Sequence, residues 1–274
     1  MTRSVSTIPT PVAASVRELQ DATPSPPSAD VVLTVAQRRA LRPPLTHKRF
    51  YIQRRLTRCV LRMIDAYPEV FRGGTVVDYG CGDMPYRPFI EPAADRYCGV
   101  DLPSNDAAQA CLHADGTTPY ADASADVVLS TQVLEHVDSP TGYLAEAWRI
   151  LRPGGTLMLS THGIWWHHPH PQDLWRWTGE GLQRVLGEAG FTTQRFEGVC
   201  NLAAAGVYLL QDGTYGRLPQ RGPLRPAYFA VMQSLAAAVD RVGIRDRHRM
   251  AAIFVVLATK DERTPTTHAT ETAP

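Results

Sequence analysis

Apolar and polar positions along the middle of the chain alternate in a way that predicts strands separated by helices. Short apolar runs predict five strands, at residues 75–78, 97–100, 110–113, 126–130 and 156–160. The clearest intervening helix is expected over residues 140–151, because Pro153, Gly154 and Gly155 follow it at once. This alternation is typical of an α/β fold with a doubly wound, mostly parallel sheet, in which ligands bind at the carboxyl ends of the strands.

The pattern continues toward the C-terminus with one long interruption. A helix is expected over residues 179–189, a strand near 193–198 and a last strand over 251–258. Residues 199–250 lie between the last two strands, although a plain hairpin needs only a few connecting residues. Two apolar stretches within this insert predict a helical cap, which would shape a substrate pocket or a dimer face.

A basic segment precedes the sheet, at residues 31–74. An amphipathic helix is expected there over residues 48–66, because apolar residues recur at helical spacing. Its arginines and lysines have two interpretations: a solvated face on a helix that covers the core, or a clamp for an acidic or phosphorylated substrate. Residues 1–30 and 261–274 lack the bulky apolar groups that offset the entropy of ordering, so we expect disordered tails around a domain at residues 75–260.

Composition and charge limit the class of protein. A formal net charge of +1 gives no support to a nucleic-acid partner. The five cysteines are scattered and form no C-x-x-C pair, which favours reduced thiols over disulfides or a zinc site. No signal-peptide core is visible, and no apolar run approaches the ~18 residues that span a bilayer. We therefore expect a soluble, cytoplasmic protein without stable membrane insertion; the sequence leaves open whether it forms a homodimer.

The strongest local signal is a buried strand that ends in an acid and a turn with two glycines, Val76-Val77-Asp78-Tyr79-Gly80-Cys81-Gly82. Glycine lets the backbone approach a ligand where a Cβ would clash. A dinucleotide fold needs a third glycine, but Pro85 stands at that position. The second cofactor that fits such a turn is S-adenosylmethionine, which has no phosphate and carries an ammonium and a sulfonium. An acid at the strand end, Asp78, makes sense as its electrostatic partner.

Two further acids follow strand ends in order. Asp101 ends the second strand, where a carboxylate can accept hydrogen bonds from both ribose hydroxyls. Asp115 follows the third strand and could accept from the adenine amine, while the next backbone N–H, that of Gly116, could donate to a ring nitrogen. One such acid can be a turn cap, but three in order beside a glycine turn are hard to explain as caps.

These segments together resemble the motif series of class I S-adenosylmethionine-dependent methyltransferases. The resemblance rests on VVDYGCG, YCGVDL, ADGTTPYADASADVV, STQVLEHVDSP and LRPGGTLMLS, and it covers residues 75–198. More narrowly, the chain resembles the small-molecule methyltransferases typified by ubiquinone-pathway enzymes. The stretches PYRPF and HPHPQDLWRWT also resemble methyltransferases of sugar and natural-product biosynthesis. The resemblance implies a Rossmann-like methyltransferase fold, S-adenosylmethionine as cofactor and a small-molecule acceptor.

The resemblance also implies the cofactor contacts. Asp78 with Gly80, Cys81 and Gly82 would bind the methionine part of the cofactor. Asp101 and Leu102 would bind the ribose, and Asp115 and Gly116 would bind the adenine. Gln132, after the fourth strand, would lie near the methionine end.

Candidate chemistry gathers in two loops at the same sheet edge. Glu135 and His136 follow the fourth strand, and the loop after the fifth holds His162, His167, His168, His170 and Asp173. An alcohol acceptor benefits from a general base, and imidazole suits that role near pH 7. We therefore expect O-methylation in specialised metabolism, with N- or C-methylation, or binding of the cofactor without transfer as a regulator or scaffold, as alternatives.

Two features of these loops stay open. Similar enzymes with E-x-x-E-H after the fourth strand bind a divalent metal, but Gln132 replaces the first acid here, and Asp173 or a nearby histidine would have to supply a ligand. Metal dependence is therefore unknown. Four tryptophans lie in the second loop, at positions 165, 166, 175 and 177. They suit either an aromatic wall for an apolar or sugar-ring acceptor, or the hydrophobic hinge of a lid.

Overall fold

The computed structural model describes residues 31–169, 171–242 and 247–261. The expected tail at residues 1–30 and all but Asp261 of the tail at 261–274 lie outside the described residues.

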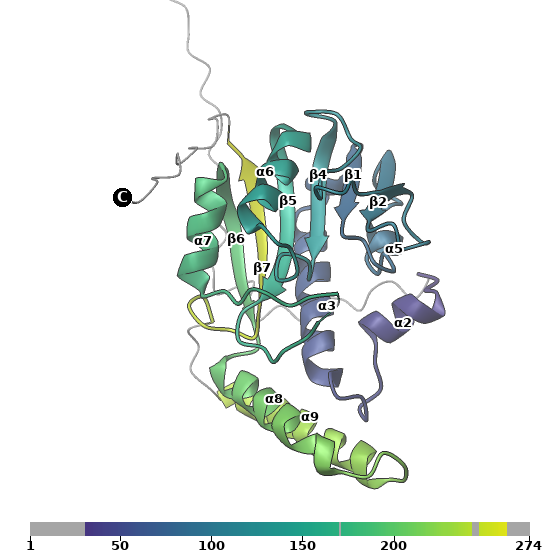
Figure 1. Cartoon of the computed structure of the whole chain (residues 1–274), viewed down its shortest axis with the longest axis vertical. Coiled ribbons are helices and arrows are strands. Elements are labelled where there is room, and N and C mark those ends of the chain that lie inside the picture. The colour runs from purple at the N-terminus through teal and green to yellow at the C-terminus, as the bar shows by residue number, and fades with distance from the viewer. Residues whose placement is uncertain (1–30, 170, 243–246, 262–274) are drawn as a thin grey trace, which may run out of the picture. The chain divides into compact units, whose positions relative to one another are not determined.

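A seven-stranded sheet forms the centre of the protein, in the order β3-β2-β1-β4-β5-β7-β6. Its strands, of which Figure 1 labels all but β3, are β1 Thr75–Tyr79, β2 Arg96–Asp101, β3 Ala110–Cys111, β4 Ala125–Thr131, β5 Leu151–His162, β6 Phe191–Val199 and β7 Ile253–Lys260. Strands β1 to β5 pair in parallel, whereas β7 pairs antiparallel with both β5 and β6. The predicted α/β fold with a doubly wound, mostly parallel sheet is confirmed. The third strand is shorter than expected, because residues 113–117 form a tight turn.

Helices cover both faces of this sheet, and the alternation of strand residues decides which face each side chain joins. Val76 packs into the core on the side of α3 (Phe50–Ala66), while its neighbour Val77 packs on the side of α6 (Pro140–Ile150) and α7 (Gly179–Glu188). The short helices α2 (Val35–Leu41), α4 (Pro68–Phe71) and α5 (Arg87–Ile90) complete the N-terminal part. Both faces are covered, which explains why the central strands are apolar almost throughout.

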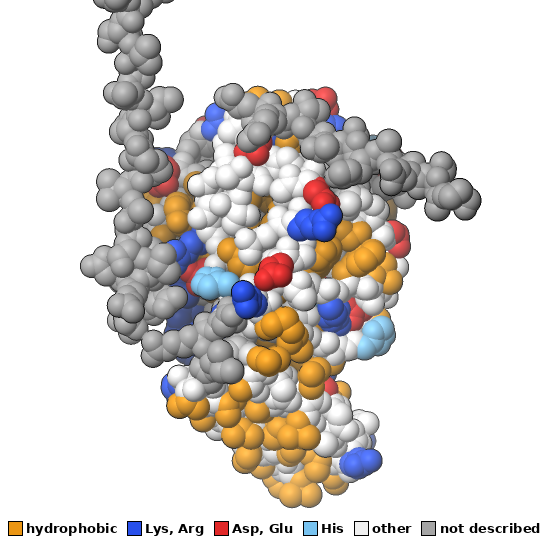
Figure 2. Space-filling model, turned by 90° about the vertical axis from the view of Figure 1, so that its left-hand side faces the viewer, with side chains coloured by type: hydrophobic (Ala, Val, Ile, Leu, Met, Phe, Trp, Pro, Cys, Tyr) orange, Lys and Arg blue, Asp and Glu red, His pale blue; other side chains and the backbone are white. Residues whose placement is uncertain are grey.

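The insert before the last strand is helical, as expected. It consists of α8 (Leu202–Thr214), a 3-10 turn η1 (Tyr215–Arg217) and α9 (Leu224–Val242). Figure 1 shows this hairpin beyond the carboxyl ends of the parallel strands. Apolar side chains gather over the same end of the molecule in Figure 2, and those that are exposed on the hairpin include Leu210, Leu224 and Val231.

The hairpin supplies the N-terminal cap of α3. The helix's own N-cap residue offers no side-chain hydrogen bond. Instead, Gln233 Oε1 of α9 accepts from the Tyr51 amide (2.9 Å), and Tyr208 Oη of α8 accepts from the Ile52 amide (2.9 Å). Gln233 Nε2 also donates to the Lys48 carbonyl (2.8 Å). The first backbone amides of a helix have no partner within the helix. In α3, their hydrogen-bond acceptors come from the hairpin, which lies far along the chain.

All five cysteines are described, and each is a free thiol. In the part of the chain that the structure describes, no helix is long and apolar enough to cross a membrane.

Candidate functional site

The glycine turn after β1 follows the sequence expectation closely. Gly80 and Gly82 have φ angles of 76° and 49°, in the left-handed region that favours glycine. A Cβ on Gly80 would lie 2.6 Å from Val133 Cγ2, so the turn packs directly against the loop after β4. The amides of Gly80 and Cys81 donate to the Val100 carbonyl (2.9 and 3.2 Å), which ties the turn to β2.

Asp78 lies beneath this turn with one acceptor atom still available. Its side chain is buried, and Tyr97 Oη donates to Oδ2 (2.5 Å), while Oδ1 has no hydrogen-bond partner among the described residues. Burial raises the pKa of Asp78 to about 7, and the Tyr97 hydrogen bond opposes that shift. A buried carboxylate oxygen without a partner is a costly feature, and a ligand ammonium would satisfy it.

Asp101 lies at the end of β2, beside the glycine turn. Its carboxylate accepts from the Gly82 amide (2.8 Å), the Leu102 amide (2.8 Å) and Asn105 Nδ2 (2.7 Å). Because a carboxylate has about four lone-pair sites, one remains for a ligand hydroxyl. Sequence reasoning missed Asn105, although an amide four residues after the strand-ending acid was a signal for a residue that orients it.

Asp115 and Gly116 lie in the tight turn after β3. Thr117 donates to Asp115 Oδ1 from its amide (3.0 Å) and its hydroxyl (2.7 Å), and these hydrogen bonds lower the pKa of Asp115. The Gly116 amide donates to the His113 carbonyl (2.9 Å). The expectation that this N–H is free to donate to adenine is therefore wrong for this conformation, because the turn itself uses it; Asp115 Oδ2 stays a candidate acceptor.

Gln132 joins the loop after β4 to strand β5. Its φ of 60° is unusual for a residue with a side chain. Its amide donates to the Ser160 carbonyl (2.8 Å), and its Nε2 donates to Ser160 Oγ (3.2 Å). This anchored, strained turn directs the following Glu135 and His136 toward β5.

Glu135 is the buried centre of the second loop cluster. Thr161 Oγ1 donates to its Oε2 (2.8 Å), and its Oε1 lies 3.3 Å from His162 Nδ1 and 3.8 Å from His136 Nε2. Burial raises the pKa of Glu135 to about 7, and burial lowers the pKa of His162 well below its usual value. Glu135 and two imidazoles therefore share a small buried site, in which burial favours the neutral forms of Glu135 and His162.

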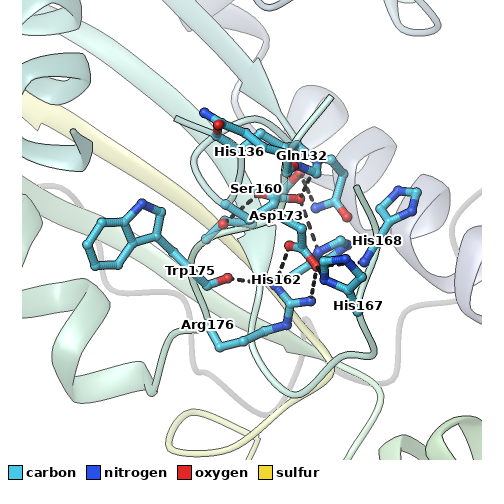
Figure 3. A network of polar contacts seen from close by, with 12 residues as sticks. Gln132, His136, Ser160, His162, His167, His168, Asp173, Trp175 and Arg176 are labelled. Atoms are coloured by element: carbon cyan, nitrogen blue, oxygen red, sulfur yellow. Dashed lines mark hydrogen bonds and ion pairs between the residues drawn. The ribbon is translucent and has the colours of Figure 1, made fainter. Parts of the chain in front are cut away.

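Three histidine rings, those of His136, His162 and His168, lie close together in these two loops, and Figure 3 labels them. The ring centroids of His136 and His162 lie 6.3 Å apart, and His168 lies 5.7 Å from the first and 5.8 Å from the second. His136 Nδ1 faces the Gln172 carbonyl (2.5 Å) and donates to it. His167 instead is 75% exposed in its side chain, so it lies at the rim, and His170 lies outside the described residues.

Asp173 has a different role from the one expected of a catalytic acid. Arg176 donates to both of its oxygens (2.6 and 2.5 Å), and the His168 amide donates to Oδ2 (2.6 Å). Although burial alone would raise the pKa of Asp173, these hydrogen bonds lower it to about 2. Figure 3 shows this pair bracing the loop after β5. Within residues 31–169, 171–242 and 247–261, no group of three or more His, Cys, Asp or Glu residues is arranged to hold a metal.

The tryptophans divide into two pairs. Trp165 is buried and stacks on His162 (5.1 Å) and on Trp166 (3.9 Å), next to a pocket of about 540 Å³ that Trp166 lines. Trp175 and Trp177 stack on each other instead (6.2 Å). The first pair favours the interpretation as an aromatic wall.

Comparisons with known proteins agree with this architecture. A family model described as "Methyltransferase domain" matches residues 45–195, more than half of the chain. The chain is 33% identical over 99 residues to malonyl-(acyl-carrier protein) O-methyltransferase from Hahella chejuensis, covering 31% of this chain and 36% of that protein. It is 34% identical over 110 residues to ubiquinone biosynthesis O-methyltransferase from Roseobacter denitrificans, covering 35% and 44%. The chain thus matches less than half the length of these relatives.

Among solved structures, the 4+2 cyclase SpnF has a TM-score of 0.48 and 19% identity, covering 75% of this chain and 82% of that one. Likeness of this degree does not distinguish one function from another.

The protein belongs to the class I S-adenosylmethionine-dependent methyltransferase family. The cofactor of this family is S-adenosylmethionine, and the residues present fit it. The Asp78 oxygen that has no partner among the described residues suits an ammonium, and the acceptor site left on Asp101 suits a ribose hydroxyl.

Proposed function

We propose that this protein transfers the methyl group of S-adenosylmethionine to a hydroxyl of a small molecule in specialised, natural-product or sugar metabolism. The observation that carries the proposal is the convergence of Glu135, His136 and His162 at the carboxyl edge of the sheet, beside the glycine turn. The two relatives named above are both O-methyltransferases by name, which supports oxygen as the acceptor atom.

The bound cofactor supplies an electrophilic methyl group on a sulfonium. The protein's part is to hold the acceptor in line, exclude water and receive the hydroxyl proton. Burial lowers the pKa of His162, which keeps the ring neutral but also weakens it as a base, so accepting that proton needs a neighbouring carboxylate. Glu135 then stabilises the imidazolium, because its carboxyl group lies 3.3 Å from His162 Nδ1. In such a transfer, a lone pair of the acceptor oxygen would form the bond to the methyl carbon, and the electron pair of the broken carbon–sulfur bond would stay on sulfur.

The cofactor contacts are proposed as follows. Asp78 and the turn at Gly80, Cys81 and Gly82 hold the methionine part, and Gln132 lies at the same end. Asp101 and Leu102 hold the ribose, with Asn105 as the positioning residue for Asp101. Asp115 accepts from adenine beside Gly116, through its remaining oxygen.

The test uses the full chain with saturating S-adenosylmethionine and a deproteinised extract as the acceptor source. We expect S-adenosylhomocysteine to form and methyl label to enter the small-molecule fraction. Glu135→Gln and His162→Gln should each reduce the rate about 10²–10⁴-fold, with unchanged cofactor affinity, as for loss of a general base. His248→Gln is the matched control, since His248 lies outside the cluster and is exposed.

Other outcomes would contradict the proposal in distinguishable ways. Cofactor binding without any turnover would favour a regulator or scaffold. Methyl label found only in macromolecules would contradict the proposal that the acceptor is a small molecule. If both variants kept activity within about threefold, positioning alone would carry the reaction, and an amine or carbon acceptor would be favoured. Inhibition by EDTA that Mg²⁺ reverses would favour a metal-dependent mechanism over a general base.

A further inference from the structure

A pocket of about 540 Å³ lies next to the histidine cluster. Its lining comes from three distant parts of the chain: the residues before α3, the loop after β5 and the hairpin at α8 and η1. Lys48 and Arg49 enter it from the first part, and Asp212 enters from α8. Trp166 and Tyr215 provide aromatic walls. Aromatic walls with a few charged groups are typical of sites for small polar molecules.

Arg49 lines this pocket without a carboxylate partner among the described residues. Its Nε is buried and has no hydrogen-bond partner there, and its Cζ lies over the Trp166 ring, 4.9 Å from the ring centroid. Burial lowers its pKa, with Asp212 opposing the shift. Because a guanidinium stays charged and presents a fork of donors that matches a planar oxyanion, Arg49 is arranged to receive an anion.

Lys48 and Asp212 complete the charge pattern. Lys48 Nζ lies 5.3 Å from the centroid of the Tyr215 ring and forms no ion pair in the described structure. Asp212 Oδ2 is buried and has no hydrogen-bond partner among the described residues. Burial raises the pKa of Asp212, and the two neighbouring cations oppose that shift. The pocket thus offers two cations to an anion and one acid to a hydrogen-bond donor.

The pocket is connected to the proposed chemistry through His168. Arg49 Nη2 lies 3.3 Å from His168 Nδ1. Since a guanidinium can only donate, Nδ1 accepts, and the proton of a neutral His168 is on Nε2. The His168 ring is also 5.7 Å from that of His136. An anion bound at Arg49 therefore places the rest of its molecule beside the histidine cluster.

We propose that this pocket binds the methyl acceptor, and that the acceptor is a hydroxylated small molecule with an oxyanion, either a carboxylate or a phosphate ester. Arg49 and Lys48 receive the oxyanion, Asp212 accepts from a hydroxyl, and Trp166 and Tyr215 enclose the carbon skeleton. Only the identification of the ligand as the acceptor rests on the proposed function; binding itself does not.

Binding is tested on the full chain saturated with S-adenosylhomocysteine, by titration calorimetry with glucose 6-phosphate, glucuronate and glucose as probes. We expect the phosphate ester or the carboxylate to bind and glucose not to bind, and the stronger of the first two identifies the oxyanion. Added salt should weaken binding. Arg49→Met should weaken it about tenfold or more, as expected for loss of a charge-assisted contact. Arg54→Met is the matched control, because Arg54 is exposed one turn into α3.

Asp212→Asn separates the hydroxyl contact from the charge. Inorganic phosphate should bind this variant more tightly than the wild type, because a repelling charge is gone, whereas the advantage of glucose 6-phosphate over phosphate should shrink. The proposal is overturned if neither anion binds better than glucose, or if Arg49→Met binds them as the wild type does. Anion binding without methyl transfer would contradict the proposed methyltransferase function but not the anion-binding pocket. Methyl transfer with wild-type kinetics in Arg49→Met would contradict the pocket as the acceptor site but not the proposed function.

Discussion

The proposed cofactor site around Asp78 and Asp101 and the proposed acceptor pocket at Arg49, here the cofactor side and the acceptor side, are built from very different lengths of chain. On the cofactor side, Tyr97 donates to Asp78, and the Gly82 amide donates to Asp101; each pair is 19 residues apart. On the acceptor side, Gln233 donates to the Lys48 carbonyl across 185 residues. The glycine turn and Asp101 need mainly two neighbouring strands, whereas the pocket needs the residues before α3, the loop after β5 and the insert together.

This difference teaches how each side depends on the rest of the fold. The glycine turn is held by β1, β2 and one contact from Val133, so its geometry follows from local pairing. The acceptor pocket exists only while the hairpin is docked on the start of α3. Changes at the docking contacts should therefore destabilise the acceptor side and leave cofactor affinity unaltered.

The largest effect is expected from Gln233→Leu. Gln233 is 1% exposed and forms hydrogen bonds with Tyr51, Lys48, Gln211 and Tyr208. Leucine fills similar space but leaves several buried polar groups without partners, so the free energy of unfolding should fall by about 3 kcal/mol. Urea denaturation measures this loss.

The matched control is Gln183→Leu, since Gln183 is exposed on α7. Calorimetry on the folded Gln233→Leu variant should show a cofactor dissociation constant within about twofold of the wild type. A large loss of cofactor affinity would show that the two sides are coupled, and would break the comparison.

The reciprocal change is Asp101→Ala, on the cofactor side. It removes the carboxylate that Gly82, Leu102 and Asn105 hold in place. Cofactor binding should weaken by about 1.5–3 kcal/mol, as for charged hydrogen bonds, while anion binding in the acceptor pocket stays unchanged. Asp106→Ala removes the same charge from the same loop and serves as the control, because Asp106 is exposed. Unchanged cofactor affinity in folded Asp101→Ala would reject the ribose assignment.

The same contrast explains what the sequence could predict. The two glycines and the acids that end β1 and β2 are visible as a motif, because strand, turn and acid are neighbours in the chain. The expectation that the loops after β4 and β5 meet follows from parallel strands ending at one edge, and the structure brings Glu135 and His162 together there. Such inferences need only the order of the strands.

Other features depended on contacts that no local pattern contains. The basic segment left two interpretations open, and only the docked hairpin sets Arg49 beside Trp166 and Asp212. His167 and His168 are adjacent in sequence, yet the first is exposed and the second lines the pocket and joins the histidine cluster. Asp173 was a candidate for catalysis because of its position, but Arg176 three residues later takes both of its oxygens.

The smallest effect is expected from Asp173→Asn, which tests whether the loop after β5 depends on an ion pair. The pKa of Asp173 lies at about 2, below its usual 3.8, so the native state binds the proton less readily than the unfolded chain. Its stabilising contribution is therefore complete above about pH 4 and is lost as the pH falls toward 2. Because Arg176 is partly exposed, the contribution should be only about 1 kcal/mol.

Urea denaturation from about pH 3 to pH 7 should show the wild type more stable than Asp173→Asn above pH 4, with the difference shrinking below it. Asp78 and Glu135 have the opposite dependence, since burial raises the pKa of each to about 7 and the native state loses stability as the pH rises from 4 to 7. The contribution of Asp78 cancels in the difference, because it is the same in both proteins. That of Glu135 cancels only in part, because the charge of Asp173 contributes to raising the pKa of Glu135. Asp65→Asn, exposed on α3, removes the same charge outside the loop and serves as the matched control. If the difference in stability between the wild type and Asp173→Asn stayed constant across this range, the charge of Asp173 would not be responsible. The hydrogen bond from the His168 amide would then hold the loop after β5 in place.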